Sequence, residues 1–358
     1  MNLREQRQRE FANIWLDSDG GILYLCPRFG KCRTAIYALQ TYPSELSILI
    51  AYPDNKIKKS WQTEFELMDY DDYNVTYTTH LSLHKYKEIK YDVVIIDEIH
   101  LLSEAQILAA YELLKINKTV MGLTGTLSNE SRGVLWTALN LRVLASYNIG
   151  QAIEEGIISD YEISIVTTPL DDDIRLPFGK QRITEKSRFK RLSYVIDQLQ
   201  NEGKDTKFLR FTRMRVFQGS IAKVRKTKEL LLKYKDERVL VFCGLTKVAD
   251  NLGIPSHHSK SSKKSIFEDF VKGDIKHLAV CRIGNTGVTY TPLNRVIINY
   301  TDSNPENLTQ KINRCMSMEY DNPDKKALIT IVSTDEPTEL AWIKRGLAFF
   351  DKSKIKYI

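Results

Sequence analysis

The residues of this sequence best suited to chemistry are a lysine, Lys31, and two adjacent acids, Asp97 and Glu98. Lys31 follows Gly30 in the stretch "LCPRFGKCRTAI", between an apolar run and a helix-like run. The N–H groups of such a loop can surround phosphate oxygens while the lysine reaches the outer phosphates of a nucleotide. The two acids end the apolar run of "YDVVIIDEIH", where Asp97 can hold magnesium through water and Glu98 can orient and deprotonate an attacking water. The combination predicts a site for a nucleotide and magnesium.

Two positions of this loop depart from the usual phosphate-binding pattern GxxxxGK[ST]. The first glycine is replaced by Leu25, and the hydroxyl after the lysine by Cys32. Because magnesium prefers oxygen to a soft thiol, we expect Asp97 and water to retain the ion without Cys32, at reduced affinity. Arg28 adds positive charge that partly offsets the loss, or is simply an exposed arginine. For Asp97 itself, the alternative interpretation is a helix-capping acid after a strand.

The elements that must position these residues are short apolar runs alternating with helix-length amphipathic segments, which is typical of parallel sheets. The expected strands of the first half are "GILYLC", "LSILIAY", "VTYTT", "YDVVIIDE" and "TVMGLTGT", and those of the second half are "RVLVFCG", "HLAVC", "RVIINY" and "ALITIVS". We therefore expect an α/β fold of two domains, 1–160 and 161–358. The segment "QAIEEGIISDYEISIVTTPLDDDIRLPFGK" is expected to join them, and a helix beginning at Pro337 is expected to close the second domain. The length of the chain leaves room for little besides these two domains.

Composition narrows the function classes. The net charge of +7 favours a polyanionic partner, and much of the excess lies in residues 179–235, for which a solvated helical face is the alternative. The five cysteines stand singly, without metal-ligand spacing, which indicates reduced thiols. The sequence shows neither a signal peptide nor an apolar run that would span a bilayer, so we expect a cytoplasmic protein without a membrane partner.

The motifs, taken in order, resemble those of superfamily-2 helicases, the DEAD/DEAH-type group with two RecA-like domains. "PRFGK" is similar to a variant of the phosphate loop in that group, and "DEIH" matches the DEAH box at three of four positions. The resemblance covers nearly the whole chain. It implies tandem RecA-like domains with mostly parallel sheets, ATP and Mg²⁺ as cofactors, and nucleic acid as the partner.

In the first half, the resemblance implies three segments that face nucleic acid. "YPDNKIKKSW" offers Pro53, Lys56 and Lys59, and "VTYTTHLSL" offers the hydroxyls of Thr78 and Thr79. "GLTGTLS" resembles the motif that links the ATP site to the nucleic-acid path, through Thr124 and Thr126.

In the second half, "RVLVFCGLTKVADNLG" resembles motif IV with Thr246, and "CRIGNTGVTY" resembles motif V with Thr286 facing nucleic acid and Gly287 facing the nucleotide. "QKINRCMS" resembles QxxGRxxR, in which Gln310 and Arg314 match. Arg314 is implied to be the arginine that stabilises charge on the transferring phosphoryl group. Asn313 and Ser317 depart from the pattern, which leaves a single arginine finger.

The resemblance also implies that further residues around the phosphate-binding loop contact the nucleotide, and that residues near the N-terminus contact its adenine. The implied catalytic residues are Lys31, Asp97, Glu98, Arg314 and Gln310, with Asp97 as the metal ligand. The implied cofactor-binding residues are Arg4, Gln8, Arg28, Phe29, Gly30, Lys31, Cys32, Arg33, His100 and Gly287. For Arg4 and Gln8, an ordinary polar helix face is the alternative.

The expected function is an ATP-dependent DNA helicase or translocase that moves on or unwinds DNA in replication, recombination or repair. DNA is favoured over RNA because the loop, the DEIH box and the turn before Trp61 look more like those of DNA-repair motors. The small size suggests a phage or mobile-element origin. The alternatives are an RNA helicase, a duplex translocase that never separates strands, an ATP-gated nucleic-acid-binding subunit that has lost turnover, and an unrelated P-loop kinase, which the ordered second-half motifs disfavour.

Overall fold

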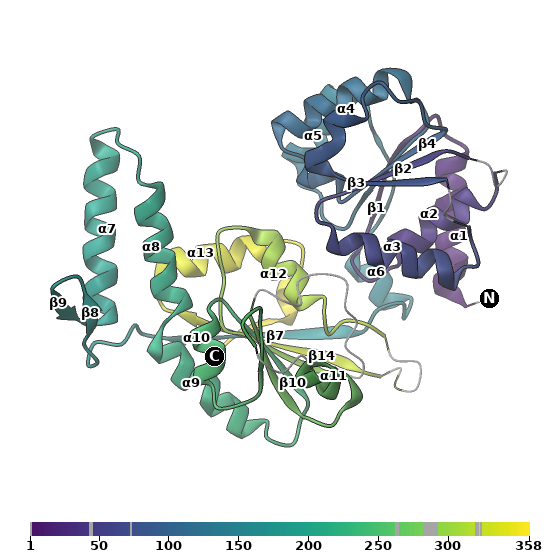
Figure 1. The fold of residues 1–358 in the computed structure, drawn as a ribbon. Helices are drawn as coiled ribbons and strands as arrows, with labels where there is room; N and C mark the ends of the chain where they lie inside the picture. The colour runs from purple at the N-terminus through teal and green to yellow at the C-terminus, as the bar shows by residue number, and fades with distance from the viewer. Residues whose placement is uncertain are drawn as a thin grey trace. The chain divides into compact units, whose positions relative to one another are not determined.

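The computed structural model describes residues 2–42, 46–71, 74–261, 265–281, 293–318, 322 and 324–358. The chain divides into two compact units, Met1–Ile158 and Ser159–Ile358, each with its own mostly parallel sheet (Figure 1). This arrangement confirms the α/β fold with two mostly parallel sheets that the alternating strand and helix patterns predict.

The described part of the first unit holds a six-stranded parallel sheet in the order β3-β2-β4-β5-β1-β6. Its strands are β1 (Gly21–Leu25), β2 (Ile48–Tyr52), β3 (Val75–Thr79), β4 (Val93–Asp97), β5 (Val120–Thr124) and β6 (Val143–Tyr147). Its helices are α1 (Leu3–Leu16), α2 (Lys31–Leu39), α3 (Lys56–Leu67), η1 (His80–Lys85), η2 (Ile99–Leu101), α4 (Glu104–Ile116), α5 (Asn129–Leu139) and α6 (Ile149–Glu154). All five residues of β2, β4 and β5 are buried, as expected for parallel strands covered on both faces.

The described part of the second unit holds a seven-stranded parallel sheet in the order β11-β12-β10-β13-β14-β7-β15. Its strands are β7 (Asp160–Thr168), β10 (Val239–Cys243), β11 (Ser256–His257), β12 (His277–Cys281), β13 (Arg295–Ile298), β14 (Lys326–Thr334) and β15 (Ile355–Tyr357). Its helices are α7 (Glu185–Asn201), α8 (Lys207–Gln218), α9 (Ile221–Lys233), α10 (Thr246–Asn251), α11 (Ser265–Lys272), α12 (Pro305–Ile312), α13 (Pro337–Gly346) and η3 (Lys352–Lys354).

The segment expected to join the two domains is partly a strand of the second sheet. β7 pairs in parallel with β14 along its whole length, from Asp160 opposite Lys326 to Thr168 opposite Thr334. Its burial alternates from residue to residue over most of its length, so it lacks the continuous apolar run of the central strands. The chain also does not end on a closing helix: α13 begins at Pro337 as predicted, but β15 follows and pairs with β7.

The second unit contains an addition that the sequence analysis left little room for. After β7, a short antiparallel hairpin of β8 (Leu176–Phe178) and β9 (Gln181–Ile183) leads into α7 and α8, which form a helical pair. The pair extends well away from the seven-stranded sheet (Figure 1). The basic excess of residues 179–235 therefore falls on this pair and on α9.

Candidate active site

The loop between β1 and α2, predicted to bind phosphate, turns through two residues in the left-handed region. Arg28 and Gly30 both have positive φ angles, 68° and 102°. A Cβ atom at Gly30 would overlap the side-chain nitrogen of Gln8, so glycine is needed for space as well as for conformation. Among the described residues, α2 has no side-chain cap at its N-terminus. Its first N–H groups therefore suit an anion such as a phosphate.

Lys31 forms an ion pair with Glu98, with 3.0 Å between Nζ and Oε1. The Lys31 side chain is 14% exposed and that of Glu98 22%, so both remain reachable from solvent. Burial acts to lower the pKa of Lys31, but the charges of Glu98 and Asp97 outweigh it and the pKa is raised. Burial acts to raise the pKa of Glu98, but Lys31 and His100 outweigh it and the pKa is lowered. Both partners are therefore charged at neutral pH.

Asp97, the last residue of β4, is held by two donors. Trp61 Nε1 donates to Oδ2 at 3.1 Å, and the Glu98 N–H donates to Oδ1 at 3.0 Å. Burial and then the negative charge of Glu98 raise the pKa of Asp97 to about 6. A buried carboxylate beside a second acid is stabilised by a cation, which fits its predicted role as a metal ligand.

His100 connects the acids of β4 with the end of β5. Its Nδ1 lies 2.7 Å from Thr124 Oγ1 and 3.6 Å from Glu98 Oε2, and its Nε2 lies 3.1 Å from Thr126 Oγ1. The Gly125 N–H donates to Glu98 Oε2 at 3.5 Å. These contacts fix the orientation of Glu98, whose own backbone has a positive φ of 50°.

Cys32 lies in the first turn of α2. Burial, followed by the charge of Asp97, raises the pKa of the thiol well above its ordinary value. The side chain is therefore a neutral thiol at physiological pH, and a neutral thiol is a poor ligand for magnesium. The next residue, Arg33, forms an ion pair with Glu64 of α3, with 2.6 Å between Nε and Oε2.

The residues present fit ATP and magnesium. Gly125 keeps the space beside the loop open, because a Cβ atom there would approach Lys31 Nζ to 3.0 Å and Pro27 Cγ to 3.2 Å. Within the described ranges, no group of three metal-ligating side chains is found. Magnesium bound to a nucleotide needs only one or two carboxylates, since phosphate oxygens and water supply the other ligands. Asp97, at the end of β4, supplies one such carboxylate.

The contacts of α1 differ for the two residues predicted to bind adenine. Gln8 is buried and donates to the Phe29 carbonyl at 2.7 Å, so it contacts the loop directly. Arg4 donates to the Ile157 carbonyl. The Phe29 ring lies in the core, with its centroid 5.6 Å from that of Phe11, so only its backbone is available to a ligand.

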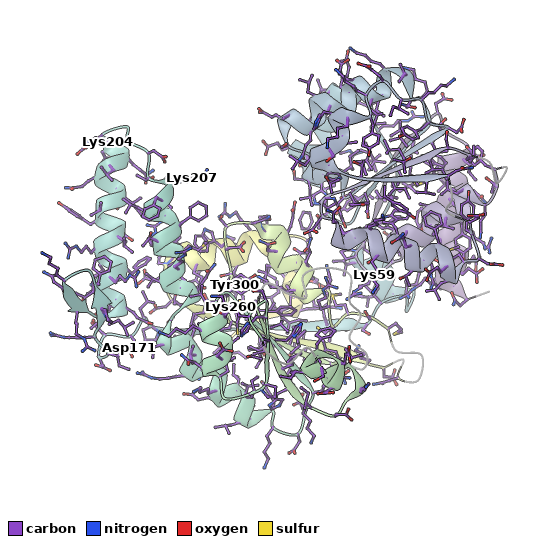
Figure 2. The ribbon with its side chains drawn as sticks, viewed as in Figure 1. Lys59, Asp171, Lys204, Lys207, Lys260 and Tyr300 are labelled. Carbon is purple, nitrogen blue, oxygen red and sulfur yellow. The ribbon has the colours of Figure 1, made fainter. Side chains whose placement is uncertain are left out.

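The predicted nucleic-acid residues of the first unit lie at the carboxyl edge of the sheet, where Asp97 also lies. Pro53 follows β2, Lys56 begins α3, and Thr78 and Thr79 end β3. Lys59 is exposed on α3 (Figure 2). The parallel register places Tyr52 opposite Thr79, which brings these segments to a common edge.

In the second unit, Thr246 begins α10 and Gln310 lies partly exposed on α12. Arg314 follows α12 and is 7% exposed. Thr286 and Gly287 lie outside the described residues.

Three residues of the site were not predicted. Trp61 was noted only as part of a turn, yet it donates to Asp97. His80 lies 2.9 Å from the Asp97 carbonyl through Nε2, and Gly125 lies against Lys31. All are distant in sequence from the residue they contact. Each lies in a segment that resembles a helicase motif, in "YPDNKIKKSW", "VTYTTHLSL" or "GLTGTLS", and that position was the signal the sequence offered.

Comparison with known proteins gives one family match. Residues 222–319 match the family described as "Helicase conserved C-terminal domain". No curated protein matches the chain in sequence. Within the described residues, no helix has the length and apolar character needed to cross a membrane.

Three solved structures share the fold of this chain. The Hef helicase domain of Pyrococcus furiosus aligns with a TM-score of 0.52 and 13% identity, covering 96% of this chain and 99% of that one. A variant of S. cerevisiae Dbp5, bound to RNA and ADP BeF3, aligns with a TM-score of 0.60 and 12% identity, over 98% of this chain and 89% of that one.

The third structure is the ATP-dependent Type ISP restriction-modification enzyme LlaBIII bound to DNA. It aligns with a TM-score of 0.63 and 12% identity over 100% of this chain, which spans 31% of that enzyme. Residues 222–319 therefore match a helicase conserved C-terminal domain, and the chain as a whole shares its fold with these solved structures.

Proposed function

We propose that the chain is an ATP-dependent DNA helicase or translocase that couples ATP hydrolysis to movement on, or unwinding of, DNA. The observation that carries this proposal is the convergence of Lys31, Asp97 and Glu98 at one edge of a parallel sheet, with 3.0 Å between Lys31 Nζ and Glu98 Oε1. A lysine at a helix N-terminus beside two acids is suited to holding a triphosphate and activating water.

The described side chains support distinct steps. Magnesium, when bound, neutralises charge on the phosphate oxygens. Asp97, oriented by Trp61, would hold that ion. Lys31 would exchange its Glu98 partner for phosphate oxygens, and the released Glu98 carboxylate would accept a proton from the attacking water.

In the second unit, we propose that Arg314 stabilises charge on the transferring phosphoryl group. Gln310, one turn earlier on α12, is the second candidate of that motif. Both assignments rest on the "QKINRCMS" resemblance and on the family match, which includes residues 310–317. Substitution of Arg314 by Lys keeps the charge but removes the planar guanidinium, so a loss of turnover with retained nucleotide binding would support the assignment.

The test is the rate of phosphate release with single-stranded DNA, duplex DNA, forked DNA and RNA in parallel, with the Glu98→Gln variant as the control. A rate of phosphate release that is higher with one of the DNA substrates than with RNA supports the proposal in full. Stimulation by RNA alone would replace it with an RNA helicase. Strand displacement and triplex displacement assays then separate unwinding from movement along an intact duplex.

A second candidate is an ATP-gated nucleic-acid-binding subunit without turnover. The observation that favours it is Cys32, a neutral and partly buried thiol where an oxygen ligand for magnesium is usual. This candidate predicts binding of ATP and nucleic acid with no phosphate release under any of the four conditions.

A further inference from the structure

The second unit contains a groove of about 880 Å³ that none of the helicase motifs explains. It lies between the outer part of the α7–α8 pair and the helix α13. Its lining residues are Asp197, Gln200, Gly203, Lys204, Asp205, Thr206, Lys207, Arg210, Phe211, Arg213, Met214, Ser303, Thr338, Trp342 and Arg345. We refer to it as the α8 groove.

One face of α8 forms the first wall of the α8 groove. Lys207, Arg210, Phe211 and Met214 recur at intervals of three, one and three residues, which places them on one side of a helix. The opposite wall comes from α13 at the same kind of spacing, through Thr338, Trp342 and Arg345. The groove therefore runs between two helix faces rather than through a loop.

The lining is strongly basic. Its charged members are five basic residues (Lys204, Lys207, Arg210, Arg213, Arg345) and two acids (Asp197, Asp205). Asp205 accepts from the Lys207 N–H at 2.8 Å and so is engaged at the start of α8. Lys204 and Lys207 lie at the outer end of the helical pair, where α7 ends and α8 begins (Figure 2). An excess of positive charge in a concave surface attracts a polyanion.

Aromatic rings accompany these charges. The side chain of Phe211 is 52% exposed although it lines the groove, and Phe208 on the same helix is 80% exposed. Trp342 on the other wall packs edge-on against Phe217, with centroids 5.7 Å apart, which fixes its position. Exposed rings between basic side chains are the arrangement on which nucleic-acid bases stack while phosphates meet the charges.

The helical pair is firmly attached at its base, so the groove has a defined shape. The buried carboxylate of Glu185, in the first turn of α7, accepts from Ser220 Oγ at 3.0 Å and from the Ile221 N–H at 2.5 Å, at the start of α9. Asp171, before α7, pairs with Arg225 of α9 at 2.8 Å. These contacts join the pair to a helix of the main body.

We propose that the α8 groove binds single-stranded nucleic acid, with bases stacked on Phe211 and phosphates held by Lys207 and Arg210. This inference rests on the proposed function, because it adds a second grip on the strand that the motor would move. Charge alone would also suit an acidic protein segment. The exposed Phe211, which lines the same groove as Lys207 and Arg210, favours a strand whose bases are unpaired.

The experiment measures fluorescence anisotropy of a labelled oligonucleotide with the full chain across a series of salt concentrations. A DNA strand and an RNA strand of the same sequence are used in separate arms to identify the sugar. The groove variant Lys207→Gln/Arg210→Gln is compared with Lys233→Gln/Lys235→Gln, a matched loss of two charges on and after α9, outside the groove. For single strands the slope of log K against log salt becomes shallower by about 0.7 for each lost phosphate contact. The slope of the groove variant, which loses two contacts, should therefore be shallower than that of the wild type by about 1.4.

A second pair of variants tests stacking separately from charge. Phe211→Leu should lower affinity by about 5- to 150-fold without changing the salt slope, because stacking on a ring is worth 1–3 kcal/mol per base. Phe349→Leu, at an exposed phenylalanine outside the groove lining, is its control and should bind as the wild type does.

The outcomes separate the two proposals. Equal binding by groove variants and their controls, when the wild type binds single strands, overturns the groove assignment and leaves the proposed function standing. A wild type that binds no nucleic acid overturns both proposals, and an acidic protein segment would then be the occupant that the charge suits.

Discussion

The ammonium of Lys31 and the carboxylate of Glu98 are 3.0 Å apart, although one follows β1 and the other follows β4, and β5 lies between these strands in the sheet. The pair holds the lysine at the start of α2 and the acid at the end of β4 in one site. Any phosphate that binds at the loop must compete with Glu98 for Lys31. This competition leads to the first prediction.

Glu98→Gln should bind ATP about three- to tenfold more tightly than the wild type. The substitution removes the partner of Lys31 and a negative charge beside the phosphates, which is worth about 1 kcal/mol for a partly exposed pair. Equilibrium binding of a fluorescent ATP analogue measures the change. Glu64→Gln, which removes the partner of Arg33 instead, is the control and should have a smaller effect. Weaker binding by Glu98→Gln would show that the acid helps to hold the nucleotide.

Gly30→Ala should destabilise the first unit and weaken ATP binding. The residue has a φ of 102°, and a Cβ atom would overlap the Gln8 side chain. Strain of this kind costs about 1–3 kcal/mol. Gly179→Ala is a matched control, since its φ is also positive, at 62°, but a Cβ atom there has nothing within 4 Å. Urea denaturation gives the change in the free energy of unfolding for each variant. Equal losses of stability in Gly30→Ala and Gly179→Ala would argue against the close approach of Gln8 to Gly30.

Cys32→Ser should lower the magnesium concentration needed for half-maximal ATP binding, on the order of tenfold, because it supplies an oxygen where the wild type has a protonated thiol. Cys32→Ala should behave like the wild type, since the thiol contributes no ligand. A magnesium titration with the fluorescent analogue compares the three proteins. If Cys32→Ala requires much more magnesium than the wild type, the thiol takes part in the site after all.

Lys311 should make the second unit less stable at low pH. Burial, opposed by Asp302, lowers the pKa of this buried amine to about 7, whereas an exposed lysine titrates near 10.5. Between pH 7 and 10 the unfolded chain therefore binds more protons than the folded one, and the free energy of unfolding rises with pH by up to about 1.4 kcal/mol per unit.

The Lys311→Met variant should lack this contribution and should be more stable than the wild type at pH 6. Denaturation of both proteins at several pH values gives the difference, in which the other titrating groups largely cancel. A difference that does not change with pH would mean that Lys311 stays charged in the fold, where its Nζ lies over the Tyr300 ring at 3.5 Å.

The parts of the fold that sequence predicts are those coded by local pattern. The strands β2, β4, β5 and β10 are mostly apolar and are buried at every residue, because both faces of a parallel sheet are covered. β7 was missed because partly exposed and buried residues alternate along much of it and a run of acids follows. The α7–α8 pair was missed because an amphipathic pattern does not tell a helix covering a sheet from one packed on a neighbouring helix.

The same division holds for the candidate site. Lys31 and the acids of β4 stand next to strand ends, and parallel strands bring their carboxyl ends to one edge, so their proximity follows from pattern. The contact of Trp61 with Asp97 and that of Gln8 with Phe29 depend on how α3 and α1 pack, which no local sequence pattern encodes. Thr286 and Gly287 lie outside the described residues, so their roles stay predictions.

The most direct test of the central claim is the phosphate-release rate of the wild type and of Glu98→Gln, each saturated with ATP, magnesium and single-stranded DNA. If Glu98 is the base that activates water, the wild type should exceed the variant by at least about 100-fold, the low end for loss of a general base. A wild type no faster than Glu98→Gln would contradict the assignment of ATP hydrolysis to this site.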